Sequence, residues 1–325
     1  MALCLVLAFQ WGGNQYVWSN WRVILLLALA GVLLVSFLSI EHWAGDGSLV
    51  PLKMLRQRMI VCASLITFCN FAHLFLLAYY LPFYFQAACG ASTIASGVMY
   101  LPTAISLGIA SMAGGQITKT LDYYNMTLML GSILMTVGAG LITTFTPATT
   151  PKSWISYQVI YGFGIGLTFQ PLFVGVQTVL HDSIVPRALV MSSFAQMFGG
   201  IVILSVAQNV FLSRLAENLV NRAPQMDSAA TLSKGALGIV GAFPERYREQ
   251  VLISYNGSLV QVFYIALGLT CVVAVSSLGM EWKSVKVRKD DGEDEEENSD
   301  GPQNIAGEES NEDREVEDAD GKAEQ

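Results

Sequence analysis

Apolar residues dominate the chain in long blocks that hold few or no charges. Seven of these blocks are long enough for an α-helix to cross a hydrocarbon core of about 30 Å, at about 1.5 Å per residue. A further apolar run at residues 2–9 is too short to cross. We interpret this run as the end of another span and not as a signal peptide, because no basic region precedes it. The seven complete spans are expected at about residues 22–41, 60–84, 94–115, 125–146, 154–177, 188–211 and 257–280.

The composition supports an all-α polytopic membrane protein. Hydrophobic residues make up 53% of the 325 residues and charged residues only 14%. Residues 290–325 hold 17 of the 26 acidic residues but almost no apolar ones, which predicts a disordered tail. We therefore expect one span end, one complete span and a connector in residues 1–59, a bundle of six spans in residues 60–285, and the tail in residues 286–325.

The basic residues of the short loops predict the orientation of the chain. If the spans alternate in direction, most of these residues fall on one side, which the positive-inside rule assigns to the cytoplasm. The acidic tail is then cytoplasmic, and the segment 213–255 is extracellular. Within that segment, RLAENLVNR (214–222) has the pattern of a short interfacial helix.

The span 154–177 carries glycines and amides along one side. These residues recur at spacings of four or seven, so they share one strip of a helix. An amide in hydrocarbon needs a partner, and glycines let another helix approach closely. We expect the strip to face either a neighbouring helix or a substrate-facing cavity, and the pattern leaves both open. The strip consists of Gln158, Gly162, Gly166, Gln170 and Gln177.

One face of the span 60–84 carries the ionisable side chain of His73. Asn70, Leu77, Tyr80 and Tyr84 lie on the same face at helical spacing. A histidine inside a membrane is a candidate proton relay or substrate contact. The alternative interpretation is a hydrogen-bonded packing residue. Asn70, His73 and Tyr80 are therefore candidate substrate-binding residues.

Two further segments hold candidate residues. In the span 188–211, Gln196 is a candidate substrate contact, and Gly199 and Gly200 predict close packing, for which we expect the span 154–177 as partner. The segment GGQITKTLDYYN (114–125) is expected as a tight cytoplasmic loop. Its Gly115, Lys119 and Asp122 either set the topology or form a charge latch at a cytoplasmic gate.

Several classes of function lack their usual signatures. The five cysteines form no CxxC pair, so neither a disulfide framework nor a metal site is predicted. The glycines at 162, 164 and 166 lie inside an apolar run and do not form a nucleotide-binding loop. Basic residues are scattered among the loops, which argues against nucleic-acid binding. We expect neither an enzyme nor a resident cofactor.

Taken together, a series of segments resembles the fungal fourteen-span drug:proton antiporters of the major facilitator superfamily, in particular mycotoxin-type efflux pumps. The similarity extends over about residues 2–288. The segments include QWGG (10–13), PLKMLRQR (51–58), YYLPFYFQ (79–86), SGVMYLP (96–102), YQVIYGFGIGLTFQ (157–170), AQMFGG (195–200), SVAQNVF (205–211) and MEWKSVK (280–286).

This resemblance implies efflux of small organic molecules, driven by a proton gradient, from a plasma, vacuolar or vesicle membrane. It identifies residues 22–41 as the eighth span and residues 60–280 as the six-helix C-terminal bundle. The first six spans are then absent, so a truncated gene model or fragment is our hypothesis, and an N-terminal bundle is the expected partner in cis or in trans. The alternatives are a seven-span receptor, a membrane-embedded enzyme and a fragment that does not transport.

Overall fold

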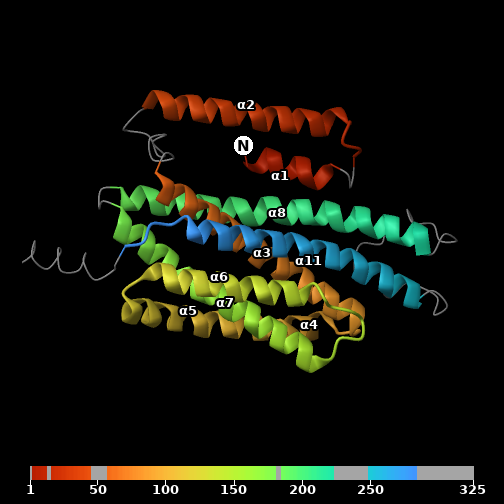
Figure 1. The fold of residues 1–325 in the computed structure, drawn as a ribbon. Helices are drawn as coiled ribbons and strands as arrows, with labels where there is room; N and C mark the ends of the chain where they lie inside the picture. Colours follow the sequence, from red (N-terminus) through yellow and green to blue (C-terminus); the bar gives the residue numbers. More distant parts are fainter. Residues whose placement is uncertain (1, 13–15, 45–56, 181–183, 223–247, 284–325) are drawn as a thin grey trace, which may run out of the picture. The chain divides into compact units, whose positions relative to one another are not determined.

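The computed structural model describes residues 2–12, 16–44, 57–180, 184–222 and 248–283. Nearly all of them are helical, and the described part contains no strand, which confirms the expected all-α class (Figure 1). The tail after residue 283 lies outside the described residues. The helices are α1 (Ala2–Trp11), α2 (Trp21–Ala44), α3 (Arg58–Ala88), α4 (Thr93–Met99), α5 (Leu101–Leu121), α6 (Tyr124–Ile142), α7 (Pro151–Val179), α8 (Val185–Arg222) and α11 (Arg248–Leu278).

Six helical segments in the described part are long and apolar enough to cross a membrane. They are α3, α4 together with α5, α6, α7, α8 and α11, and they match the six spans expected after residue 60. The span expected at 22–41 coincides with α2, in which the apolar part Trp21–Phe37 is shorter. The run expected to end a span is α1, a helix of 10 residues.

Two groups of three helices make up the bundle. In the first group α3 packs against both α8 and α11, and in the second α7 packs against both α5 and α6. Contacts of α11 with α6 and of α3 with α7 join the groups. Figure 1 shows α8 and α11 running side by side, with α6 next to α11. The helix α1 packs against α8 of the first group, and α2 packs against α1.

Proline has a different effect in each span that contains it. The helices α3 and α7 continue through Pro82 and Pro171. Between α4 and α5 the helix is interrupted at Tyr100, and Pro102 occupies the first turn of α5, where a missing N–H costs little. The α4 N-terminus is capped by Ser92, whose hydroxyl accepts a hydrogen bond from the Ala95 N–H at 3.2 Å.

The expected interfacial helix at 214–222 was wrong, because these residues continue α8 as one helix of 38 residues. Phe211, Leu215 and Leu219 lie four residues apart and are all buried, so the apolar stripe of the span runs on without a break. Both ends of the segment 213–255, expected as an extracellular loop, are therefore helical. Residues 213–222 belong to α8, and residues 248–255 belong to α11. The middle of the segment, residues 223–247, lies outside the described residues.

The expected loop at 114–125 was also too long. Gly115 and Lys119 belong to α5, and α6 begins at Tyr124. Only Asp122 and Tyr123 connect the two helices, and Asp122 makes the turn with a left-handed φ of 59°. Aspartate tolerates this conformation better than most residues, which explains how so short a connection closes.

Candidate functional site

The polar face of α3 is turned into the bundle. Asn70, His73, Leu77, Tyr80 and Tyr84 are all buried. The spacing of these residues puts them on one side of the helix, and their burial shows that α3 directs this side towards the protein and not towards lipid. Each polar group on this face therefore needs a partner within the protein.

A chain of hydrogen bonds links this face of α3 to α7. The His73 Nδ1 atom lies 2.6 Å from the Tyr161 hydroxyl, and the Nε2 atom lies 3.4 Å from the Asn70 side-chain oxygen. The Asn70 amide nitrogen donates to the Thr168 hydroxyl at 3.0 Å. Thr168 in turn donates to the backbone carbonyl of Ile165 at 2.7 Å. We call Asn70, His73, Tyr161 and Thr168 the α3–α7 polar chain.

The α3–α7 polar chain fits one protonation state of the imidazole. Because Asn70 uses its nitrogen to donate to Thr168, its oxygen is the atom that accepts from His73 Nε2–H. A neutral imidazole then presents a bare Nδ1, which accepts the hydrogen bond from Tyr161. A second proton on Nδ1 would force the Tyr161 O–H to turn away. In this arrangement His73 acts as a neutral connector between two helices.

A second polar contact joins α7 to the interruption between α4 and α5. The Gln158 side-chain nitrogen donates to the Met99 carbonyl at 3.0 Å, and the Thr103 hydroxyl donates to the Gln158 side-chain oxygen at 2.9 Å. Met99 is the last residue of α4, so its carbonyl needs a partner from outside the helix. The fully buried Gln158 amide supplies that partner and fixes α7 against α5.

Gly162 and Gly166 lie where α7 approaches α5 most closely. A Cβ atom at Gly162 would meet the Thr103 carbonyl oxygen at 2.4 Å. A Cβ atom at Gly166 would meet the Leu107 carbonyl oxygen at the same distance. No side chain fits at either position without moving the backbone of α5, so this part of the strip packs against a helix.

The remaining amides lie in a different environment. Gln170 and Gln177 are exposed in the described structure. A Cβ atom at Gly115 of α5 would lie 3.9 Å from the Gln170 side chain, so Gln170 borders the same helix as the glycines. The strip of α7 is thus divided between a buried half, which contacts α5, and an exposed half, which carries two amide side chains.

The glycines of α8 pack against α3. A Cβ atom at Gly199 would meet the Phe68 carbonyl oxygen at 2.4 Å, and one at Gly200 would meet the Phe75 ring at 2.6 Å. The helices α7 and α8 also touch, as expected, but these glycines do not make that contact. Gln196, one turn earlier, is half-buried.

The residues of the expected loop motif lie on the surface near the start of α6. Lys119 is exposed and Asp122 is half-buried. After them, the Tyr124 hydroxyl donates to the Glu281 carbonyl, and the Asn125 side chain donates to the Met280 carbonyl at 3.3 Å. The end of the described chain is therefore held beside the α5–α6 turn.

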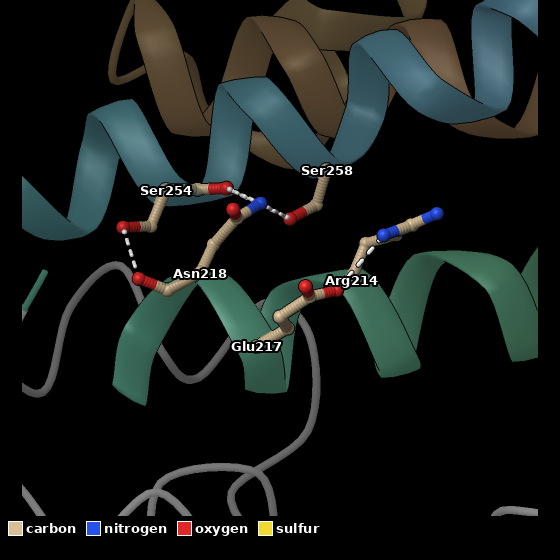
Figure 2. Close-up of polar contacts among 5 residues, drawn as sticks. All are labelled: Arg214, Glu217, Asn218, Ser254 and Ser258. Atoms are coloured by element: carbon tan, nitrogen blue, oxygen red, sulfur yellow. Dashed lines mark hydrogen bonds and ion pairs between the residues drawn. The ribbon is translucent and has the colours of Figure 1, made fainter. Parts of the chain in front are cut away.

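Polar side chains also join the ends of α8 and α11 (Figure 2). The Asn218 side-chain nitrogen lies 3.4 Å from the Ser254 carbonyl and 3.0 Å from the Ser258 hydroxyl, and the Ser254 hydroxyl donates to the Asn218 carbonyl at 3.3 Å. Arg214 and Glu217 form an exposed ion pair at 2.9 Å one turn away. We call Asn218, Ser254 and Ser258 the α8–α11 clasp.

Several of these partners were not apparent from the sequence. Tyr161, Thr168 and Thr103 carry no pattern that separates them from ordinary apolar-helix residues. Burial of Asn70, His73 and Gln158 predicts that partners exist, but not which residues they are. Within the described residues no three His, Cys, Asp or Glu side chains come together as a metal site would require.

These features define an all-α integral membrane protein whose spans are joined by neutral polar side chains. No protein-family model matches the chain. The chain is 40% identical over 287 residues to the MFS-type transporter VdtG of Byssochlamys spectabilis, an alignment that covers 88% of this chain and 52% of VdtG. It is 40% identical over 290 residues to the aspyridones efflux protein of Neocamarosporium betae, covering 89% of this chain and 51% of that relative.

A third relative is the efflux pump aflT of Aspergillus parasiticus, which is 38% identical over 285 residues, or 87% of this chain and 55% of the pump. The resemblance to fungal efflux pumps of the major facilitator type is thereby confirmed. The chain spans about half the length of the curated relatives that it matches.

Proposed function

We propose that the chain is the membrane-embedded part of a transporter that exports small organic molecules. The observation that carries this proposal is the alignment of 88% of the chain with a relative named as a transporter, together with the matches to proteins named as efflux pumps. The aligned region contains all six helices that could cross a membrane. The proposal makes the chain a carrier and not an enzyme.

The amide and aromatic side chains at the surface of the bundle support an uncharged substrate. Gln170, Gln177 and Gln196 are amides on the accessible or half-buried surface of the bundle, and Phe75 and Phe194 are exposed aromatic residues on α3 and α8. Amides and aromatic rings contact uncharged organic molecules without the desolvation cost that a fixed charge would bring. We therefore propose small uncharged organic metabolites or drugs as the class of substrate.

Alternating access needs two bundles that rock about a central binding site. We propose that a second bundle, in cis or in trans, completes the transporter, that a proton gradient drives it, and that the plasma membrane is its location. Because the α3–α7 polar chain holds His73 as a neutral connector, we assign His73 a packing role and propose that proton coupling lies outside the described residues.

Disruption of the coding region in the organism that encodes this chain tests the proposal. Metabolites should be retained in the cells and depleted in the medium, and reintroduction of the gene should restore export. Unchanged partition of every secreted metabolite between cells and medium would overturn export as the function. A parallel disruption outside the coding region controls for effects of the procedure.

A further inference from the structure

Three tyrosines meet where α3, α8 and α11 come together. The Tyr79 and Tyr80 rings on α3 have centroids 5.1 Å apart, and the Tyr80 ring lies 5.7 Å from that of Phe211 on α8. Phe211 in turn contacts Tyr255 on α11 at 5.3 Å in an edge-on arrangement. We call Tyr79, Tyr80 and Tyr255 the tyrosine cluster.

The Tyr255 hydroxyl is buried and has no hydrogen-bond partner among the described residues. Two other buried tyrosines of this bundle are paired: Tyr84 donates to the Thr146 carbonyl at 2.7 Å, and the Tyr161 hydroxyl lies 2.6 Å from the His73 Nδ1 atom. A buried phenol without a partner is costly, most of all inside a bilayer, where no bulk water can replace the missing group. The Tyr255 hydroxyl is therefore a fully buried hydrogen-bond donor of the tyrosine cluster that the described residues do not use.

The backbone around Tyr255 is fixed from two sides. The α8–α11 clasp holds Ser254, directly before Tyr255, and Ser258, three residues after it (Figure 2). The Asn256 side chain donates to the Phe145 carbonyl at 3.0 Å. Because these bonds set the rotation of α11, the Tyr255 ring cannot easily turn to find another partner. Its ring is held in place against that of Phe211.

Tyr79 connects the cluster with the surface. Its side chain is 47% exposed, whereas Tyr80 and Tyr255 are buried. The Tyr79 ring packs on Phe83 with centroids 4.8 Å apart. An exposed ring on the outer part of α3 can change rotamer without disturbing the core beneath it, so movement of Tyr79 would open the cluster to a ligand.

We propose that the tyrosine cluster binds an oxygen-bearing, uncharged aromatic molecule, with the Tyr255 hydroxyl donating a hydrogen bond to a carbonyl oxygen of that molecule. The ring of the ligand takes the place of the Tyr79 ring against Tyr80 and Phe83. All side chains of the cluster are uncharged, which favours a neutral ligand over an ion. This inference rests on the proposed export function, since it names a class of substrate and one contact that recognises it.

Two probes of similar shape separate the hydrogen bond from the aromatic contact. 7-Methoxycoumarin is planar and carries a carbonyl oxygen, and 2-methoxynaphthalene has a similar planar shape without that carbonyl. The purified 325-residue chain is placed in lipid nanodiscs, and the affinity for each compound is measured by saturation-transfer NMR, with empty nanodiscs subtracted. We expect tighter binding of the coumarin.

Tyr255→Phe removes only the donor. It should weaken coumarin binding about 3- to 10-fold, the range expected for one neutral hydrogen bond, and leave the naphthalene unaffected. Tyr264→Phe is the matched control, because Tyr264 is an exposed tyrosine of the same helix, and it should change neither affinity. Tyr79→Leu should weaken or strengthen binding of both compounds together, since it changes the entrance and not the donor.

Equal coumarin affinity of Tyr255→Phe and the unaltered chain would overturn the proposal, and this is also the result expected if Tyr255 holds only a water molecule. Failure of the unaltered chain to bind either compound would overturn it as well. If Tyr255→Phe does not fold, Tyr79→Leu takes its place, and an unchanged affinity of that variant for both compounds contradicts the proposal. Because none of these measurements involves export, they can fail while the retention of metabolites in the disrupted strain still supports the proposed function.

Discussion

The His73 imidazole on α3 and the Tyr161 hydroxyl on α7 form a 2.6 Å hydrogen bond between residues that are 88 positions apart in the sequence. Both side chains are fully buried, so neither can exchange its partner for water. This bond, continued through Asn70 to Thr168, is a polar connection between the two groups of helices. Its removal should therefore be measurable as a loss of stability.

Tyr161→Phe leaves the buried Nδ1 atom of His73 without a donor and should lower the free energy of unfolding by about 1–3 kcal/mol. SDS-induced unfolding of the purified chain measures this change. In a double-mutant cycle, the variant that carries both Tyr161→Phe and His73→Leu should lose less stability than the sum of the two single-variant losses. The difference should be about 0.5–3 kcal/mol. Strictly additive losses, or a loss no larger than that of the exposed control Tyr264→Phe, would contradict the contact.

Gly166→Ala should destabilise the chain by about 1–3 kcal/mol, because the added methyl group would overlap the Leu107 carbonyl of α5. Gly108→Ala, in α5 itself, is the matched control. A Cβ atom at Gly108 meets nothing within 4 Å, so this variant should be neutral or slightly more stable. The temperature of aggregation in detergent, followed by size-exclusion chromatography, ranks the two variants. The reverse order would show that α5 and α7 are not in close contact.

Two neighbouring residues at the end of α8 should differ in their importance. Asn218→Ala removes the two side-chain bonds of the α8–α11 clasp and keeps the bond from the Ser254 hydroxyl to the backbone carbonyl at position 218. It should cost about 1–2 kcal/mol, since the Ser258 hydroxyl and the Ser254 carbonyl lose a partner. Glu217→Ala breaks only the exposed pair with Arg214 and should change stability by less than about 0.5 kcal/mol. Unfolding in SDS at low and high salt tests both statements. Equal losses would rule out the clasp as the contact that holds α11.

Cys89 follows directly after α3 and is exposed. Partial burial of its sulfur nevertheless raises the pKa of the Cys89 thiol above its ordinary value. Only the thiolate reacts with maleimides, so labelling of Cys89 should be slow at pH 7 and rise about tenfold per pH unit below that pKa. The buried Cys69 should stay unlabelled at every pH in the folded chain.

The same labelling tests the orientation. If the acidic tail is cytoplasmic, a membrane-impermeant maleimide should label Cys89 on intact cells, whereas an epitope on the tail should need permeabilised cells. The strain used carries serine at the other four cysteines, and its Cys89→Ser derivative is the blank. Labelling of Cys89 only after permeabilisation would reverse the orientation predicted from the basic loops.

The sequence by itself determined the all-α class, the six spans after residue 60 and which polar residues share one face of α3. Each follows from a local pattern, because the length of an apolar block fixes a span and the helical period fixes which residues share a face. The same reasoning grouped Asn70, His73 and Tyr80 on one side of the helix, and the structure shows that all three are buried. It also found the resemblance to fungal efflux pumps, which the relatives confirm.

Only the tertiary structure decided which helix each face meets. Periodicity describes one helix at a time, so it could not show that Gly199 packs on α3 or that Tyr161 completes the polar chain of His73. It also treated the α7 strip as uniform, whereas α5 covers Gln158 and leaves Gln170 exposed. The Tyr255 hydroxyl, which has no partner among the described residues, is the clearest case, because hydrogen-bond pairing is a property of the packed bundle and of no single segment.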